Sequence, residues 1–296
     1  MKIVYLLIFS FLLSNDLRFN GESAFLYIKE QCQFGPRFPG SGAHANLTKY
    51  LYNHFKTYSD SIEIFSDTIN HPFNNQKIEI KNFLIKHNIK AKERYLLMAH
   101  FDTRDRADKD SNPDKINLPI MGANDGASGV ALLMELSKYL SQNILHNIGI
   151  DILLVDAEDM GRSGHKNEWG LGTQSFVKNY KGLLPKYAIC VDMIADQNPI
   201  FKIEGFSYRQ AKDLVHEIWT LANDLGYKEF VWQLSPPIYD DHFYYFEGTS
   251  VPSIDIIDFD YPHWHTTDDT IENCSSKGLS IVGNVLLEFI YLKDKK

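Results

Sequence analysis

Cysteine is scarce in this chain, which has three in 296 residues: Cys32, Cys190 and Cys274. An odd number leaves at least one thiol unpaired unless another chain supplies a partner. No CxxC pair occurs, which argues against a zinc site built from thiolates. Cys190 lies within an apolar run, so we expect a small buried hydrophobe there. A disulfide between Cys32 and Cys274 stays open as an alternative in an oxidising compartment.

Clusters of positive charge are also absent. The 30 Lys and Arg residues are scattered among 38 Asp and Glu residues, and the net charge is −8 at pH 7. Nucleic-acid binding requires a basic patch that can neutralise phosphates. We therefore expect no nucleic-acid partner, and we interpret the scattered charges as solvated surface.

The apolar run at the N-terminus, residues 3–13, is too short to span a bilayer as a mature helix. It follows the charged start Met1-Lys2, and this pattern is typical of a secretory signal peptide. Residues 14–16 depart from the usual small-x-small cleavage pattern, and the alternative is an N-terminal core segment. We expect a signal peptide at residues 1–15 and a periplasmic or secreted protein, with no stable membrane span once the leader is removed.

Internal repeats, low-complexity blocks and Pro/Gly/Ser linkers are absent too, so residues 16–296 are predicted to form a single catalytic domain. Hydrophobic periodicity predicts helices at 23–33, 43–58, 127–140, 172–180, 209–225 and 278–292, and another directly after Asp240-Asp241. Strands are predicted at 62–69, 77–85, 95–99, 148–155, 187–193 and 253–257. Strands that alternate with helices predict an α/β fold, a three-layer sandwich with a central mixed, mainly parallel sheet.

Acidic residues and histidines recur where the apolar runs stop, which is where open α/β sheets place their sites. The main candidates are His100, Asp125, Glu158, Asp159, Asp192, Asp240, Asp241 and His265. Carboxylate oxygens with one or two imidazoles make a zinc site, and a spare carboxylate beside the ligands is a general base. The shared position at strand ends favours a metal site, without deciding between one zinc ion and two.

Most of these acids also have a simpler interpretation. Asp125 lies in a glycine-rich turn before a helix, where Asp is a favoured N-cap. Glu158 and Asp159 are open to interpretation as an exposed acidic loop, although adjacent acids after a buried strand are costly without nearby positive charge. Asp192 is open to three interpretations: a ligand, a hydrogen-bond acceptor or a cap.

The C-terminal motifs add an imidazole and a pocket wall. One of Asp240 and Asp241 is expected to cap the helix that follows, which leaves the other free for function. His265 precedes the polar residues 266–269, which offer partners to orient its imidazole. Trp264 would wall the pocket beside it.

In this order, the motifs resemble the zinc aminopeptidase-like superfamily, and more closely the glutaminyl-peptide cyclotransferases of the animal type that also occur in bacteria. The resemblance runs from the loop at 33–37 to the final helix. Two features favour the cyclase branch: Trp264 directly before the expected ligand His265, and the paired acids at 240–241. The stretch 100–129 looks most like the bacterial members.

The resemblance implies one zinc ion per chain with three ligands: Asp125, Asp159 and His265. It also implies that Glu158 is the general acid/base, and that Asp192 and Asp240 form a hydrogen-bond relay with it. His100 matches a residue that binds a second metal in the aminopeptidases and that the cyclases keep without that metal.

The resemblance further implies a substrate pocket lined by Trp264, with Trp169 as a second tryptophan. Tyr239 is expected in the same pocket, where the animal enzymes have Gln. Asp159 stands where the animal enzymes have Glu, so its reach is shorter while its oxygen ligands are the same. These departures concern the shape of the pocket and not the reaction.

The resulting hypothesis is cyclisation of an N-terminal glutamine in peptides or proteins to pyroglutamate, with release of ammonia. Zinc would polarise the γ-carboxamide, and Glu158 would move the proton from the α-amino group to the leaving ammonia. The alternative is a two-zinc aminopeptidase, in which Asp125 bridges both ions and His100 and Asp192 bind the second. A non-catalytic binding protein is disfavoured because Glu158 and His265 are both present.

Overall fold

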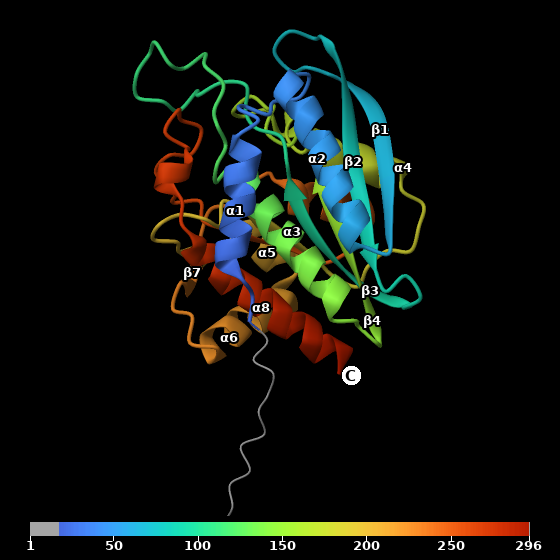
Figure 1. Ribbon diagram of the computed structural model, residues 1–296. Helices are drawn as coiled ribbons and strands as arrows, with labels where there is room; N and C mark the ends of the chain where they lie inside the picture. The colour runs from blue at the N-terminus through green and yellow to red at the C-terminus, as the bar shows by residue number, and fades with distance from the viewer. Residues whose placement is uncertain (1–17, 296) are drawn as a thin grey trace, which may run out of the picture.

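The computed structural model of the protein describes residues 18–295, so the predicted signal peptide at 1–15 lies outside the described residues. The described chain folds as α/β around a central six-stranded sheet, as predicted (Figure 1). Within this range, no helix combines the length and the apolar character needed to cross a membrane.

The central sheet has the strand order β1-β2-β4-β3-β5-β8. Its strands are β1 (Ser61–Asn70), β2 (Lys77–His87), β3 (Glu93–His100), β4 (Ile148–Val155), β5 (Ala188–Asp192) and β8 (Ser253–Ile257). Strands β4, β3, β5 and β8 are parallel neighbours, and the β1–β2 hairpin adds antiparallel pairs at one edge. The predicted mixed, mainly parallel sheet is therefore confirmed.

Helices cover both faces of this sheet. One face packs against α1 (Gly21–Cys32), α2 (Gly42–Tyr58), α3 (Ala127–Gln142), α6 (Lys212–Asp224) and α8 (Ser276–Asp294). The opposite face packs against α4 (Leu171–Asn179) and α7 (Asp241–Thr249). Successive strand residues alternate between the layers, so Leu97 joins the first core and Leu96 the second. Figure 1 shows α1, α2 and α3 lying over the same face.

Two details differ from the prediction. The expected helix at 209–225 is two helices, α5 (Gly205–Gln210) and α6, because Ala211 has φ −146° and ψ 43° and interrupts the helical backbone. A separate two-stranded sheet, β6 (Phe201–Ile203) and β7 (Phe230–Leu234), was not predicted, because β6 has three residues and β7 is largely exposed after Phe230. Two short 3-10 turns, Lys166–Glu168 and Ile271–Asn273, complete the elements.

The parallel strands bring their carboxyl ends to one edge of the sheet, and the connecting loops gather above that edge. His100 ends β3 and Asp192 ends β5, while the loops after β4 and β8 carry Glu158 and His265. Cys190 is buried in β5, as predicted. All three cysteines belong to the described chain and are free thiols.

Candidate active site and metal centre

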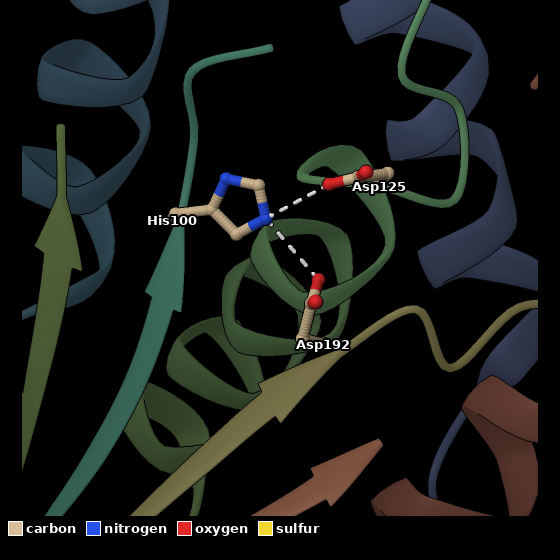
Figure 2. Close-up of side chains that lie close together, drawn as sticks. All are labelled: His100, Asp125 and Asp192. Carbon is tan, nitrogen blue, oxygen red and sulfur yellow. Dashed lines mark hydrogen bonds and ion pairs between the residues drawn. The ribbon is translucent and has the colours of Figure 1, made fainter. Parts of the chain in front are cut away.

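Three side chains from different elements converge at the end of β3 (Figure 2). The Nε2 atom of His100 lies 3.2 Å from Asp125 Oδ1 and 3.2 Å from Asp192 Oδ1. Asp125 comes from the turn before α3, and Asp192 from the last position of β5. All three side chains are buried. They form one group with the donor atoms and spacing of a metal site.

A second group shares Asp125 with the first. His265 Nε2 lies 3.1 Å from Asp159 Oδ1 and 3.6 Å from Asp125 Oδ2. The two oxygens of Asp125 therefore face different histidines, the arrangement of a carboxylate that can bridge two cations. The structure thus brings together the three predicted zinc ligands, and beside them the two further residues of the two-zinc alternative.

The second group fits a zinc ion. Asp125 Oδ2 and Asp159 Oδ2 are buried, and neither has a hydrogen-bond partner within residues 18–295. Buried acceptors without partners are costly, and a cation bound between them would satisfy both. Two carboxylates and one imidazole are a donor set that zinc accepts, with a further position left for substrate.

The electrostatics of this group favour a cation too. Burial and the neighbouring Asp159 raise the pKa of Asp125 to about 7. Burial disfavours the charged form of His265, but Asp159 and Asp108 outweigh it and raise the pKa of that imidazole to about 9. Burial opposes ionisation of Asp159 as well, yet His265 and Arg104 lower its pKa. The metal-free group therefore holds protons that a divalent cation displaces.

Glu158 lies beside the metal group without belonging to it. It lines the same cavity as Asp159 and Asp240. Burial and the Asp240 carboxylate raise the pKa of Glu158 well above its ordinary value. The backbone N–H groups of Glu158 and Asp159 donate to the buried carboxylate of Asp102 at 3.0 and 3.2 Å. These hydrogen bonds fix the turn that places Glu158 next to the candidate metal ligands.

A cavity of about 230 Å³ opens in front of these groups and contains all three predicted pocket residues, Trp264, Trp169 and Tyr239. The ring centroids of Trp264 and Trp169 lie 4.0 and 6.2 Å from that of His265. Tyr239 is partly exposed and packs against Phe206 and Phe243. The cavity is lined by aromatic and aliphatic side chains together with the candidate acids and His265.

The partner that orients His265 is not one of the predicted residues 266–269. Asp108 Oδ1 lies 3.3 Å from His265 Nδ1. Arg104 binds both oxygens of Asp108 at 2.8 Å, and its Nη1 donates to Asp159 Oδ1 at 3.1 Å. Arg104 and Asp108 were missed because they belong to the long loop between β3 and α3, where no periodic pattern predicts which side chains turn inward.

Two capping predictions also need correction. Asp125 does not cap α3, because the N-cap is Gly126 and no side chain caps that end. Asp240 does cap α7, since its carboxylate accepts from the N–H of Asp241, yet Asp240 also lines the cavity. Asp241 is fully buried and accepts from Thr173 Oγ at 2.6 Å. The capping acid and the acid in the cavity are therefore the same residue, where two different ones were expected.

Comparisons with known proteins identify the family and the fold. The profile of peptidase family M28 matches residues 82–290, while a comparison with curated proteins found no match. Among solved structures, the glutaminyl cyclase of Bacteroides thetaiotaomicron bound to N-acetylhistamine is 32% identical with a TM-score of 0.89, over 93% of this chain and 98% of that one. The glutaminyl cyclase of Tannerella forsythia is 33% identical with a TM-score of 0.89, over 93% and 99%.

A peptidase is equally similar. A Zn-dependent exopeptidase from Parabacteroides distasonis is 35% identical with a TM-score of 0.87, over 93% of this chain and 98% of that one. The chain therefore belongs to peptidase family M28, a family of zinc-dependent enzymes, and shares the zinc aminopeptidase-like fold of bacterial glutaminyl cyclases.

Proposed function

We propose that this protein is a glutaminyl-peptide cyclotransferase that uses one zinc ion to convert an N-terminal glutamine to pyroglutamate and ammonia. The observation that carries the proposal is the pair of indoles, Trp264 and Trp169, whose rings both lie next to the ring of His265. Both line the cavity of about 230 Å³, into which one terminal residue would fit. The likeness to two bacterial glutaminyl cyclases over 93% of this chain supports the same reaction.

Asp125, Asp159 and His265 would hold the zinc ion. When bound there, zinc supplies Lewis-acid polarisation of the γ-carboxamide carbonyl. Arg104 donates a hydrogen bond to the carboxylate of Asp159, and Asp108 contacts the imidazole of His265 at Nδ1. These contacts fix the orientation of the ligands, which is the role that outer partners have in zinc enzymes.

Glu158 would carry the proton. Its carboxylate accepts a proton from the α-amino group, and the amine nitrogen then forms a bond to the side-chain carbonyl carbon. The carbon–nitrogen bond of the amide breaks, and Glu158 returns the proton to the departing ammonia. Burial and Asp240 raise its pKa, which moves its protonation toward neutral pH and suits both transfers. Asp240 and Asp192 complete the proposed relay.

Water would compete with this reaction by simple hydrolysis of the side-chain amide. The aromatic and aliphatic side chains that line the cavity would limit that competition by excluding water from the reacting carbon. The nucleophile and the carbonyl belong to one residue. Holding that residue in place therefore removes most of the entropic cost of bringing the two groups together. Tyr239, at the rim, is placed to contact the residue that follows the glutamine.

A two-zinc aminopeptidase is the second candidate, and a specific observation favours it. His100, Asp125 and Asp192 form a complete second ligand group beside the first. The exopeptidase from Parabacteroides distasonis has the same fold as this chain. With both groups filled, Glu158 would activate a water molecule in place of the substrate amine.

The test is incubation of the purified protein with one peptide that begins with Gln and another that begins with Leu, read by mass. Loss of ammonia from the first with the second intact is the expected result. Glu158→Gln should lower kcat about 10²- to 10⁴-fold at unchanged zinc content, while Glu79→Gln, on the exposed face of β2, should be neutral. Release of leucine with two zinc ions per chain would establish the aminopeptidase.

The leader pattern at residues 1–15 supports an extracytoplasmic site of action, periplasmic or secreted. Peptides or proteins with an N-terminal glutamine are then the proposed substrates. We propose no nucleic-acid partner. Expression of the full chain followed by N-terminal sequencing of the exported protein tests this location. Retention of the protein in the cytoplasm with Met1 intact would contradict it.

A further inference from the structure

Asp269 is fully buried, yet none of the chemistry above uses it. Its carboxylate accepts hydrogen bonds from the turn that carries the candidate zinc ligand Asp125. Oδ1 accepts from the backbone N–H of Asn124 at 2.8 Å, and Oδ2 accepts from the N–H of Asp125 at 3.1 Å. The backbone oxygen of Asp269 also accepts from the N–H of Ala123 at 3.3 Å. Three successive amides of the turn are thus bound by one residue.

The opposite side of the turn is held by Arg37, which is also fully buried. Its guanidinium donates to the backbone oxygens of Met121 and Gly122, both at 2.7 Å. Gly122 has φ +62°, and a Cβ atom there would lie 2.3 Å from the Cγ2 atom of Thr103. The turn is therefore fixed from two sides and tightly packed.

Asp269 itself is held in place. The hydroxyl of Tyr261, a buried residue, donates to Asp269 Oδ1 at 3.0 Å. Both residues belong to the loop after β8 that carries His265, and His265 has a left-handed backbone with φ +55°. One loop therefore carries the candidate ligand His265 and also Asp269, which holds the turn of the second ligand, Asp125.

We propose that Asp269 is a positioning residue that sets the distance between the zinc ligands Asp125 and His265 before the metal binds. A displacement of the loop that moved His265 would also move the turn of Asp125, so the two ligands keep their spacing. A ligand pair that is already in place loses less conformational freedom on binding, and the metal is held more tightly. The role applies to a cyclase and to an aminopeptidase alike, since both use these two ligands.

A matched control exists one position away. Asp268 has the same charge and lies on the same loop, but it is exposed, and its carboxylate makes no hydrogen bond within the described chain. Asp269→Asn replaces one of the two carboxylate oxygens that accept from the turn with an NH₂ group, which then faces an N–H donor. Asp268→Asn removes the same charge and leaves the hydrogen bonds between Asp269 and the turn intact. Comparison of the two separates positioning from the long-range effect of charge.

The experiment is a zinc titration of each metal-free protein against a chelator, well below its unfolding temperature, together with the absorption spectrum after Co²⁺ substitution. Asp269→Asn should weaken zinc binding about 10- to 100-fold and change the Co²⁺ spectrum. Asp268→Asn should stay within about twofold of the unmodified protein, because its charge is exposed and screened. A folded Asp269→Asn protein with unchanged zinc affinity and spectrum would overturn the proposal, whatever reaction the enzyme catalyses.

Tyr261→Phe is the second variant, and it decides the matter where Asp269→Asn does not fold. It removes one hydrogen bond that holds the carboxylate and keeps the carboxylate itself. Zinc binding should weaken about two- to tenfold, the range expected for loss of one buried hydrogen bond. Unchanged zinc affinity in a folded Tyr261→Phe protein would also count against the proposal.

Discussion

The ion pair between Arg94 and Asp151 joins β3 to β4, the two strands at the centre of the sheet. Both side chains are buried, with 5% and 3% of their surface exposed. Arg94 Nε lies 3.0 Å from both oxygens of Asp151, and Nη2 lies 2.7 Å from Oδ1. The guanidinium also donates to the backbone oxygens of residues 87 and 88 at 3.1 and 2.8 Å. Within residues 18–295, Arg94 is the one residue that donates hydrogen bonds to the Asp151 carboxylate, while Lys86 lies opposite on β2 and adds positive charge nearby.

Arg94→Met should lower the free energy of unfolding by about 3–5 kcal/mol, because it leaves the Asp151 carboxylate buried without its partner. For a chain of this size, that loss corresponds to a fall of roughly 6–20 °C in Tm. Replacement of both residues, Arg94→Met with Asp151→Leu, removes the stranded charge as well. The double variant should regain at least about 2 kcal/mol relative to Arg94→Met, a coupling that a double-mutant cycle measures.

Urea unfolding followed by both tryptophan fluorescence and far-UV circular dichroism gives these free energies, provided that the two transitions coincide. Lys186→Met is the control, since Lys186 pairs with Glu93 at 3.2 Å near the start of β3 and both are about half exposed. It should cost less than about 1 kcal/mol. The reasoning is refuted if Arg94→Met costs no more than this control, or if the double variant is no more stable than Arg94→Met.

Three further predictions concern zinc, pH and packing. Zinc at about 100 times its Kd should add about 2.7 kcal/mol to the metal-free protein in a thermal-shift titration, and His265→Ala should abolish this gain. Burial lowers the pKa of His87 to about 4, against about 6.5 when unfolded, so stability is complete above pH 6.5 and falls by up to about 3 kcal/mol toward pH 4. His87→Gln should flatten that slope in urea titrations, and an unchanged slope would contradict the assignment. In Gly129→Ala, the new Cβ would lie 2.1 Å from the Val191 backbone oxygen, so unfolding should become easier by about 1–3 kcal/mol, whereas Gly42→Ala, with open space around it, should cost nothing.

The fold was predictable because apolar periodicity and strand order depend on local pattern. The run from Ile148 to Val155 is buried throughout, as its continuous apolar character predicts. The break at Ala211 was not predictable, because alanine is a good helix former and nothing local marks an interruption. The short helix before the break has tertiary contacts at both ends: Gln210 donates to the backbone oxygen of Ser253 at 2.9 Å, and Glu204 caps α5 and is itself held by His242 at 2.9 Å. That pairing joins segments far apart in the sequence.

The candidate ligands were predictable for a related reason, since parallel strands deliver their last residues to one edge. Their partners were not. Asp108 reaches His265 from a loop whose course depends on Arg104, and Arg104 is fixed by contacts with Asp159 and with the backbone oxygen of Gly161. Each contact depends on the others. No property of residues 101–126 taken alone predicts them.

The backbone at the strand ends shows why the acids there have two different functions. Ala157 and Met193 have φ +53° and +46°, a conformation that costs a residue with a side chain about 1–2 kcal/mol. In each case the preceding acid compensates: Asp156 Oδ1 accepts from the N–H of Ala157 at 2.9 Å, and Asp192 Oδ1 accepts from that of Met193 at 2.8 Å. Both acids therefore stabilise strained turns, and Asp192 is in addition a member of a candidate metal group.

A simple criterion separates these two functions. Where backbone N–H groups converge on a carboxylate, as on both oxygens of Asp102 and of Asp269, the acid shapes a turn and has little capacity left for a cation. Where a buried oxygen has no donor within residues 18–295, as for Oδ2 of Asp125 and of Asp159, it is a candidate to bind a cation, and the same holds for Oδ2 of Asp241 and both oxygens of Asp255. Both kinds of acid follow apolar runs in the sequence, so composition and spacing alone do not distinguish them. The difference lies in the direction of the backbone amides, and these become known only when the loops have folded.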